Sequence, residues 1–185
     1  MTLKKAVALF DRRHMADACR TSFKLSDVIT VDNMKKRQVP RERVYDTELM
    51  RISSNWFTPF EWVVTGQWHM HNESNKHTFS DITLTYKGVA TLVFVLLATG
   101  TNMDIDSHIN QVPKIQSATE AWTIHFTCED SFAPIEPSLD LLSKGVNVLH
   151  FVHNLDWTKV VVHGYWKDHN GCTQTVENDV VVSVC

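Results

Sequence analysis

The residues of this chain best suited to chemistry are histidines on an alternating stretch. The chain has 10 histidines in 185 residues, and His69 and His71 stand one residue apart, which places both imidazoles on one face of a β-strand. Glu73 and His77 follow closely. Imidazole and carboxylate groups are common ligands of zinc and iron. A metal-dependent enzyme, or a ligand-binding protein that uses His69 and His71, is therefore one alternative function.

A solvated strand face explains the same histidines without a metal. Over residues 61–71, Trp62, Val64, Trp68 and Met70 fall on one face and polar residues on the other, as in a half-buried strand. The order H-x-H-x-E resembles the cupins in its first pair only, and their Gly/Pro-rich second motif is missing. His150 and His153 should point to opposite faces of a strand and cannot chelate as a pair. We predict no bound metal and no cofactor.

Other catalytic patterns are missing from the sequence. It contains no G-x-S-x-G elbow and no phosphate-binding glycine loop, and it has only 6 glycines. Its 4 cysteines form no C-x-x-C pair and no cleavable signal opens the chain, so we expect free thiols in a reducing compartment. We predict no catalytic residue and no enzymatic activity.

Positive charge is concentrated near the start of the chain. Residues 1–51 hold 12 of the 18 Lys and Arg against 7 acids, and residues 52–185 hold 6 against 14. This division predicts a basic N-terminal arm, residues 1–51, and a separate domain, residues 52–185. It indicates a polyanionic partner, either nucleic acid or an anionic membrane. The candidate contact residues are Lys4, Lys5, Arg12, Arg13, Lys35, Lys36, Arg37, Arg41 and Arg43.

Two further expectations follow from this charge. The arm has few aromatic residues for stacking on bases, so any contact with RNA should involve phosphates and depend on salt. An arm and a domain of opposite charge also favour self-association. Whether residues 35–43 act in nuclear import stays open.

The periodicity of the chain predicts the elements that carry these residues. Leu3, Val7 and Phe10 indicate a short first helix, whereas residues 20–51 lack a period and read as a mobile segment. Residues 82–98 read as a helix that ends at Gly100, with a buried strand as the alternative. A polar connection without a period spans residues 101–119, and connections of that length are usually functional or disordered.

The second half of the chain reads mainly as strands. We expect strands over residues 121–128, 146–153, 158–166 and 180–184, a helix over 138–144 and a hairpin turn at Asn170-Gly171. Trp62, Trp68 and Trp122 fall on faces that pack inward. The longest apolar run, residues 89–98, is too short to cross a bilayer. The fold class we predict is α+β: a small antiparallel sheet packed on one main helix, with a basic flexible N-terminal arm.

The order of these segments resembles the matrix proteins of rhabdoviruses. The resemblance rests on the aromatic strand Phe60–Met70, the segment Thr78–Ile82 and residues 89–100, followed by a long loop with Val112-Pro113 and the late strands 121–129 and 160–166. It covers about two thirds of the chain, as a pattern of residue types with no single specific motif. The chain lacks the P-P-x-Y budding motif of animal members, which removes the ESCRT-recruiting role and favours a plant- or arthropod-infecting member.

The resemblance implies a viral structural matrix protein that self-associates, condenses the helical ribonucleoprotein and links it to the inner face of the envelope. The implied partners are other copies of the chain, the viral nucleoprotein–RNA, an anionic membrane bound peripherally and the viral glycoprotein. The implied locations are the virion beneath the envelope, the host cytoplasm and the host nucleus. It also implies docking of a neighbouring copy on the long loop, through the apolar anchors Met103, Ile105, Ile109, Val112 and Ile115. A viral silencing suppressor that binds double-stranded RNA is a second alternative.

Overall fold

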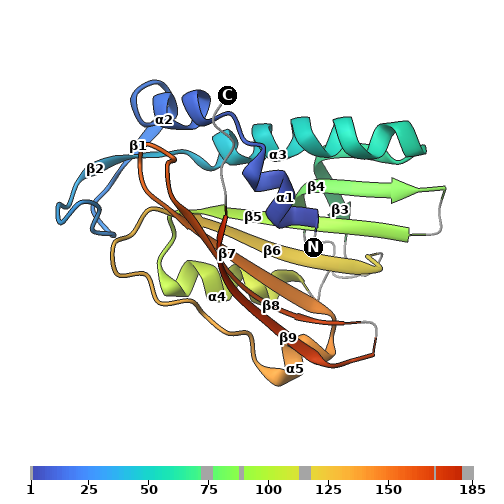
Figure 1. The fold of residues 1–185 in the computed structure, drawn as a ribbon. Coiled ribbons are helices and arrows are strands. Elements are labelled where there is room, and N and C mark those ends of the chain that lie inside the picture. The colour runs from blue at the N-terminus through green and yellow to red at the C-terminus, as the bar shows by residue number, and fades with distance from the viewer. Residues whose placement is uncertain (1, 72–76, 88–89, 113–117, 169, 181–185) are drawn as a thin grey trace.

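The computed structural model describes residues 2–71, 77–87, 90–112, 118–168 and 170–180. This part of the chain is mixed α and β, with five α-helices, a seven-stranded sheet and a two-stranded sheet (Figure 1). The strands of the large sheet are β3 (Val63–His71), β4 (His77–Tyr86), β5 (Ala90–Ala98), β6 (Glu120–Thr127), β7 (Val146–His153), β8 (Val160–Lys167) and β9 (Thr173–Val180).

The seven strands lie in the sheet in the order in which they occur in the chain. β5, β6 and β7 run parallel to one another, and every other neighbouring pair is antiparallel. Helix α4 (Asn102–Gln111) lies in the first parallel connection and α5 (Leu139–Ser143) in the second, because parallel neighbours need a crossover. The expected α and β mixture is present, but the sheet is larger than predicted and is not purely antiparallel.

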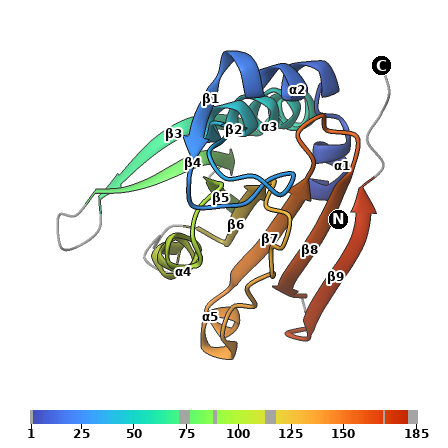
Figure 2. The same cartoon turned by 90° about the vertical axis from the view of Figure 1, so that its left-hand side faces the viewer.

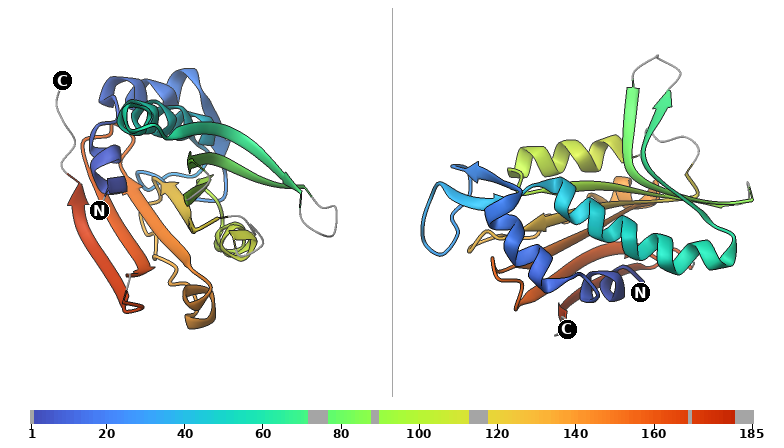
Figure 3. Two further views of the ribbon diagram at one scale, coloured as in Figure 1. Left: turned by 90° about the vertical axis from the view of Figure 1, so that its right-hand side faces the viewer. Right: turned by 90° about the horizontal axis from the view of Figure 1, so that it is seen from above.

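Two layers of helices cover opposite faces of the large sheet. The first layer contains α1 (Thr2–Ala8), α2 (Arg12–Thr21) and α3 (Glu42–Phe57), and the second contains α4 and α5 (Figures 2 and 3). A short 3-10 turn, η1 (Thr58–Phe60), joins α3 to β3. The small sheet, β1 (Phe23–Ser26) with β2 (Arg37–Pro40), connects α2 to α3 at one end of the molecule (Figure 1).

The prediction of a flexible N-terminal arm is wrong. Phe10 stacks on Trp157 with ring centroids 5.7 Å apart, and Tyr45 stacks on Phe126 at 4.4 Å. All four of these rings are buried. Helix α3 also runs across the boundary expected between residues 51 and 52. The helices α1, α2 and α3 therefore share one hydrophobic core with the sheet, because their apolar side chains cover its face.

The helix predicted for residues 82–98 is also wrong. Those residues form the antiparallel hairpin of β4 and β5, with Leu84 opposite Leu92. Lys87 has φ of +40°, a left-handed conformation that suits a turn. Since β-branched residues pack well in strands, the alternative of a buried strand was the correct one for β5.

Several predicted elements are confirmed. β3, β6, β7, β8 and α5 match the expected segments to within a few residues. The hairpin at Asn170-Gly171 joins β8 to β9, with Gly171 at φ of +76°. The last strand among the described residues is β9 at residues 173–180, and the strand predicted at 180–184 lies outside the described residues except for Val180.

Candidate membrane and polyanion interface

The nine basic residues predicted as contacts lie on folded elements. Lys4 and Lys5 belong to α1, and Arg12 and Arg13 to α2; the others are Lys35, Lys36 and Arg37, just before or at the start of β2, and Arg41 and Arg43, at the start of α3. Lys5, Arg13, Lys35, Lys36, Arg41 and Arg43 are exposed, and the other three are half-buried. The structure thus distributes these cations over the fold and does not gather them in one mobile segment.

Three of the predicted arginines already have partners within the protein. The Arg41 Nε–H donates to the Phe23 carbonyl at 2.7 Å, and Arg37 forms an ion pair with Asp32 at 3.1 Å. Arg12 Nε–H donates to a backbone carbonyl at 3.4 Å. Within the described residues, no hydrogen bond or ion pair engages the side chains of Lys35 and Lys36. These two adjacent lysines are therefore well placed to meet an external anion.

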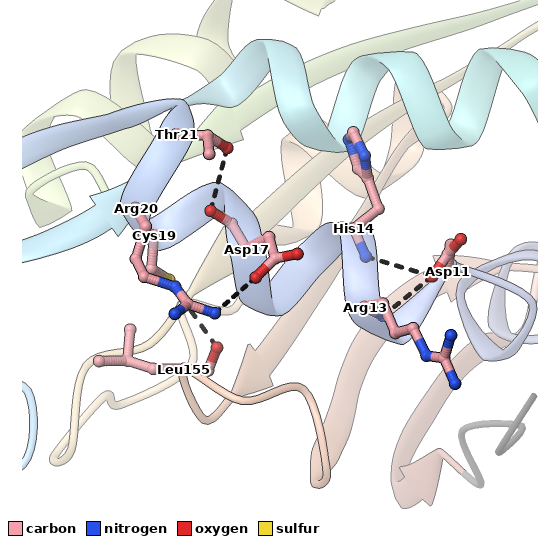
Figure 4. Close-up of polar contacts among 8 residues, drawn as sticks. All are labelled: Asp11, Arg13, His14, Asp17, Cys19, Arg20, Thr21 and Leu155. Carbon is pink, nitrogen blue, oxygen red and sulfur yellow. Dashed lines mark hydrogen bonds and ion pairs between the residues drawn. The ribbon is translucent and has the colours of Figure 1, made fainter.

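Helix α2 is held by its own side chains (Figure 4). The Asp11 carboxylate accepts hydrogen bonds from the N–H groups of Arg13 and His14, which caps the helix. The bond from the His14 N–H is the main cause that lowers the pKa of Asp11. At the other end, the Cys19 thiol lies 3.8 Å from the Leu155 carbonyl. Burial raises the pKa of this thiol. The contact joins the C-terminal end of α2 to the loop after β7.

The connection between β1 and β2 is firmly anchored. The Asp130 carboxylate accepts from the N–H groups of Asp32 at 2.9 Å and Asn33 at 2.7 Å. Both of these residues have positive φ, 51° and 59°, conformations that Asp and Asn tolerate. Ile29 and Val31 are buried beside this anchor. The connection therefore has a defined shape.

Apolar side chains of this connection, and that of Leu25 at the end of β1, are exposed to solvent. The exposed fractions are 67% for Leu25, 58% for Val28 and 48% for Met34. Lys35 and Lys36 follow Met34 directly and are exposed. We call residues 25–36 the basic–apolar hairpin. Sequence reasoning identified its lysines and missed its three exposed apolar residues, although their presence within a basic segment was the signal available.

The predicted self-association anchors are mostly buried. Thr101 and Asp104 form a capping box at the start of α4, so residues 102–111 are helical and the expected irregular loop is wrong there. Ile105, Ile109 and Val112 are at most 2% exposed and pack on β5, β6 and β7. Met103 is 82% exposed, and Ile115 lies outside the described residues. The three buried anchors hold α4 to its own sheet and are unavailable to a neighbouring copy.

Three acidic side chains lie near one another where β4 separates from β5: Glu42, Asp46 and Asp81. The pairing of β4 with β5 ends at Ile82 opposite Phe94, and the rest of β4 pairs only with β3, so that hairpin projects from the molecule (Figure 2). The Asp81 carboxylate accepts the Leu96 N–H at 2.6 Å. The Asp81 side chain therefore binds a β5 N–H group that lies beyond the end of the pairing between β4 and β5.

Burial determines the protonation of these acids. It raises the pKa of Asp46 and of Asp81 to about 6. Burial also raises the pKa of Glu42, against a hydrogen bond with the backbone of Ala98 that lowers it. One Asp46 oxygen is buried without a partner among the described residues. The Asp81 contact caps the edge of β5.

A second buried group consists of histidines on the α4 and α5 side of the sheet. His125 and His150 lie opposite each other on β6 and β7, with their Nδ1 atoms 3.3 Å apart. Phe132 packs on both rings at centroid distances of 5.1 and 5.2 Å. Burial lowers the pKa of His150 to about 4 and that of His125 well below its usual value. Both imidazoles are therefore neutral near pH 7.

His153 occupies the opposite face of β7, as predicted. Its Nε2 lies 2.8 Å from the Tyr45 hydroxyl and its Nδ1 lies 2.9 Å from the Asn154 carbonyl. Burial lowers its pKa to about 4. Because His150 and His153 face different layers of the fold, they cannot share a metal ion.

The side chains of His69, His71 and His77 lie outside the described residues, so the metal hypothesis for them stays a prediction. In the described ranges no group of three His, Cys, Asp or Glu residues could hold a metal ion. Cys19, Cys128 and Cys172 are free thiols, as expected. Trp62 and Trp122 pack on the main core, also as expected.

No helix in the described part of the chain is long and apolar enough to span a membrane. The chain was compared with protein-family models, curated proteins and solved structures, and none of the three comparisons found a match.

Proposed function

We propose that this protein is a viral structural matrix protein that binds the inner face of an anionic envelope membrane. The observation that carries the proposal is the basic–apolar hairpin, in which Leu25, Val28, Met34, Lys35 and Lys36 are all exposed and which is anchored through Asp32 and Asn33. Apolar side chains that enter the interface beside cations that meet anionic headgroups are typical of peripheral membrane binding.

The expected affinity of one copy for a membrane is low. Each of the three apolar side chains is roughly half exposed, so transferring it from water is worth about 1 kcal/mol. Each lysine near an anionic surface adds about 1 kcal/mol. The sum of about 5 kcal/mol corresponds to a dissociation constant of about 0.2 mM. Tight binding then requires many linked copies, which is why the proposal includes self-association.

The exposed cations on α1, α2 and α3 support the second part of the proposal, condensation of the viral ribonucleoprotein. Lys5, Arg13 and Arg43 are exposed on these helices, away from the hairpin in the chain. Cations on rigid elements can meet RNA phosphates in a salt-dependent way. Together with the resemblance to rhabdovirus matrix proteins, these cations support the proposal that the protein acts beneath the viral envelope.

Co-sedimentation with liposomes tests the membrane role. We expect the full-length protein to sediment with vesicles that contain phosphatidylserine, and less so at high salt because exposed charges are screened. The triple variant Leu25→Ser, Val28→Ser, Met34→Ser should bind about 100-fold more weakly, since it loses about 3 kcal/mol of transfer free energy. The double variant Lys35→Glu, Lys36→Glu should lose binding most strongly at low salt.

Matched variants elsewhere on the surface control for nonspecific effects. Met103 and Leu139 are 82% and 75% exposed, and Lys144 and Lys159 are exposed lysines. Changing the first two to Ser, or the second two to Glu, should leave binding close to that of the original protein. If the control variants lose as much binding as the hairpin variants, the hairpin is not the membrane contact. Electron microscopy of the vesicle-bound protein should show a lattice, and isolated monomers would contradict the matrix role.

A further inference from the structure

A cavity of about 910 Å³ lies between the first helical layer and the sheet, and nothing in the proposed membrane role uses it. Its roof comes from α1 and from the C-terminal end of α3, including Trp56 and Phe57. Its floor comes from β5, β6 and β8. This volume falls in the range of pockets that hold small organic ligands.

The floor of the cavity is a row of aromatic side chains across the sheet. Phe94 on β5 lies opposite Trp122 on β6, and the ring of Trp166 on β8 lies 6.4 Å from that of Trp122. Between the two tryptophans, β7 contributes Asn147, whose side-chain amide donates to the backbone carbonyls of Ala121 and Gly145. Asn147 therefore adds a short polar side chain to the cavity floor beside the two large rings.

The charges at the cavity are mainly negative. The Glu120 carboxylate accepts the Trp122 indole N–H at 2.8 Å, and only one of its oxygens is used in this bond. Asp168 and Lys167 also line the cavity, so its three ionisable residues sum to a charge of −1. The Asp168 carboxylate accepts from the backbone N–H groups of the turn that follows it.

Indole rings attract cations to their faces, and a carboxylate in contact with one of the indoles adds to that attraction. The lining also includes the aliphatic side chains of Leu3, Leu92 and Leu142, which would pack against an aliphatic or aromatic body. We propose that this cavity binds an organic cation with an apolar body, such as an alkyl-substituted or quaternary ammonium. Glu120 and the tryptophan rings would hold the cationic group, and the apolar roof would cover the body.

Isothermal titration calorimetry of the full-length protein with three probes of equal chain length tests the proposal. The probes are octyltrimethylammonium, octyl sulfate and octanol, all below their micelle-forming concentrations. We expect binding of octyltrimethylammonium, and binding at least about tenfold weaker for the other two. Equal binding of all three probes would overturn the proposal, because the cavity would then select only the apolar chain.

Two variants locate the site, and one controls for charge. Glu120→Gln keeps an oxygen that can accept the indole N–H but removes the charge, and it should weaken octyltrimethylammonium binding by about tenfold. Trp166→Leu should weaken it comparably. Glu136→Gln removes an exposed carboxylate that does not line the cavity and should leave binding unchanged. Unchanged binding in Glu120→Gln, with the thermal unfolding midpoint also unchanged, would refute the assignment.

The ammonium group could belong to a free metabolite or to a choline lipid, and a fourth probe distinguishes the two sources. If dihexanoylphosphatidylcholine competes with octyltrimethylammonium, the ligand is a lipid headgroup. If it does not compete, the ligand is a free organic cation. The hairpin variants that abolish vesicle binding should leave binding of octyltrimethylammonium intact, so this inference and the proposed membrane role can fail separately.

Discussion

Replacing Asp81 by Asn should stabilise the protein at neutral pH and leave its stability unchanged at acidic pH. The Asp81 carboxylate accepts the Leu96 N–H at 2.6 Å in a partly buried position. An asparagine oxygen can accept the same hydrogen bond without carrying a charge. The substitution therefore tests whether the ionisation of this buried acid opposes folding.

The size of the effect follows from the pKa of Asp81, which burial raises from 3.8 to about 6. A carboxyl group with a raised pKa in the folded state favours its protonated form there, so its stabilising effect is complete below about pH 4. That effect is lost as the pH rises through about 6. The full difference corresponds to about 3 kcal/mol. Because Asp81 is partly exposed, solvent screening reduces this to about 1–2 kcal/mol.

Urea unfolding followed by tryptophan fluorescence measures this effect at pH 4 and at pH 7.5. We expect Asp81→Asn to raise the free energy of unfolding by about 1–2 kcal/mol at pH 7.5 and by less than about 0.5 kcal/mol at pH 4. Asp106→Asn is the control, since Asp106 is an exposed acid on α4 and should give no difference at either pH. A loss of stability at pH 7.5 would refute the reasoning, because the charged hydrogen bond to Leu96 would then outweigh the cost of ionisation.

Two further predictions concern the core. Burial lowers the pKa of His150 and His153 to about 4. The contribution of each neutral histidine to the free energy of unfolding is therefore complete above about pH 6.5 and is lost as the pH falls towards 4. The loss is at most about 3 kcal/mol for each histidine. His153→Gln can keep the hydrogen bond to Tyr45 and should flatten this dependence in urea unfolding across pH; an unchanged slope would contradict the assignment. Gly164→Ala would place a methyl group 2.5 Å from a Leu149 methyl, and it should destabilise the protein by about 1–3 kcal/mol and lower the thermal midpoint, whereas an unchanged midpoint would show that the core relaxes freely.

Alternation of apolar and polar residues made β3 and β6 predictable, although β6 is buried on both faces. Segment length misled where two strands follow each other closely. Residues 63–71 and 120–127 alternate clearly and form β3 and β6. Residues 82–98 were predicted as one helix because of the length of the segment and the glycine that follows it, Gly100. The turn that divides them depends on the left-handed conformation of Lys87, which a lysine does not reveal in a sequence.

The helices that were missed have polar sequences whose apolar residues still follow a helical period. Ile105, Ile109 and Val112 recur at the spacing of one helix face in α4, but the acids and amides between them suggested a loop.

In α3, Glu48 is 5% exposed; its carboxylate accepts from the Arg51 guanidinium at 2.7 Å and from the Asp11 N–H at 3.0 Å. A buried charge with a partner 37 residues away cannot be recognised from local sequence.

Both candidate sites depend on distant residues. The lysines of the basic–apolar hairpin were predicted as contacts from charge alone, but the hairpin is anchored by the hydrogen bonds that Asp32 and Asn33 donate to Asp130, about 97 residues away in the chain. The aromatic cavity depends on strand register, which places Trp122 beside Trp166. Composition therefore indicated which residues carry charge and did not indicate which surface presents them.

The stacking of Phe10 on Trp157 affects how this protein folds during synthesis. The two rings are roughly 150 residues apart in the chain, and closing a loop of that length costs roughly 4 kcal/mol of chain entropy. Helix α1 also packs against β9, the last strand. The first helices therefore leave the ribosome long before their core partners do, and their apolar faces stay uncovered until translation reaches β8 and β9. Slow translation of the codons for β8 and β9 should therefore favour chaperone binding or aggregation of the nascent chain.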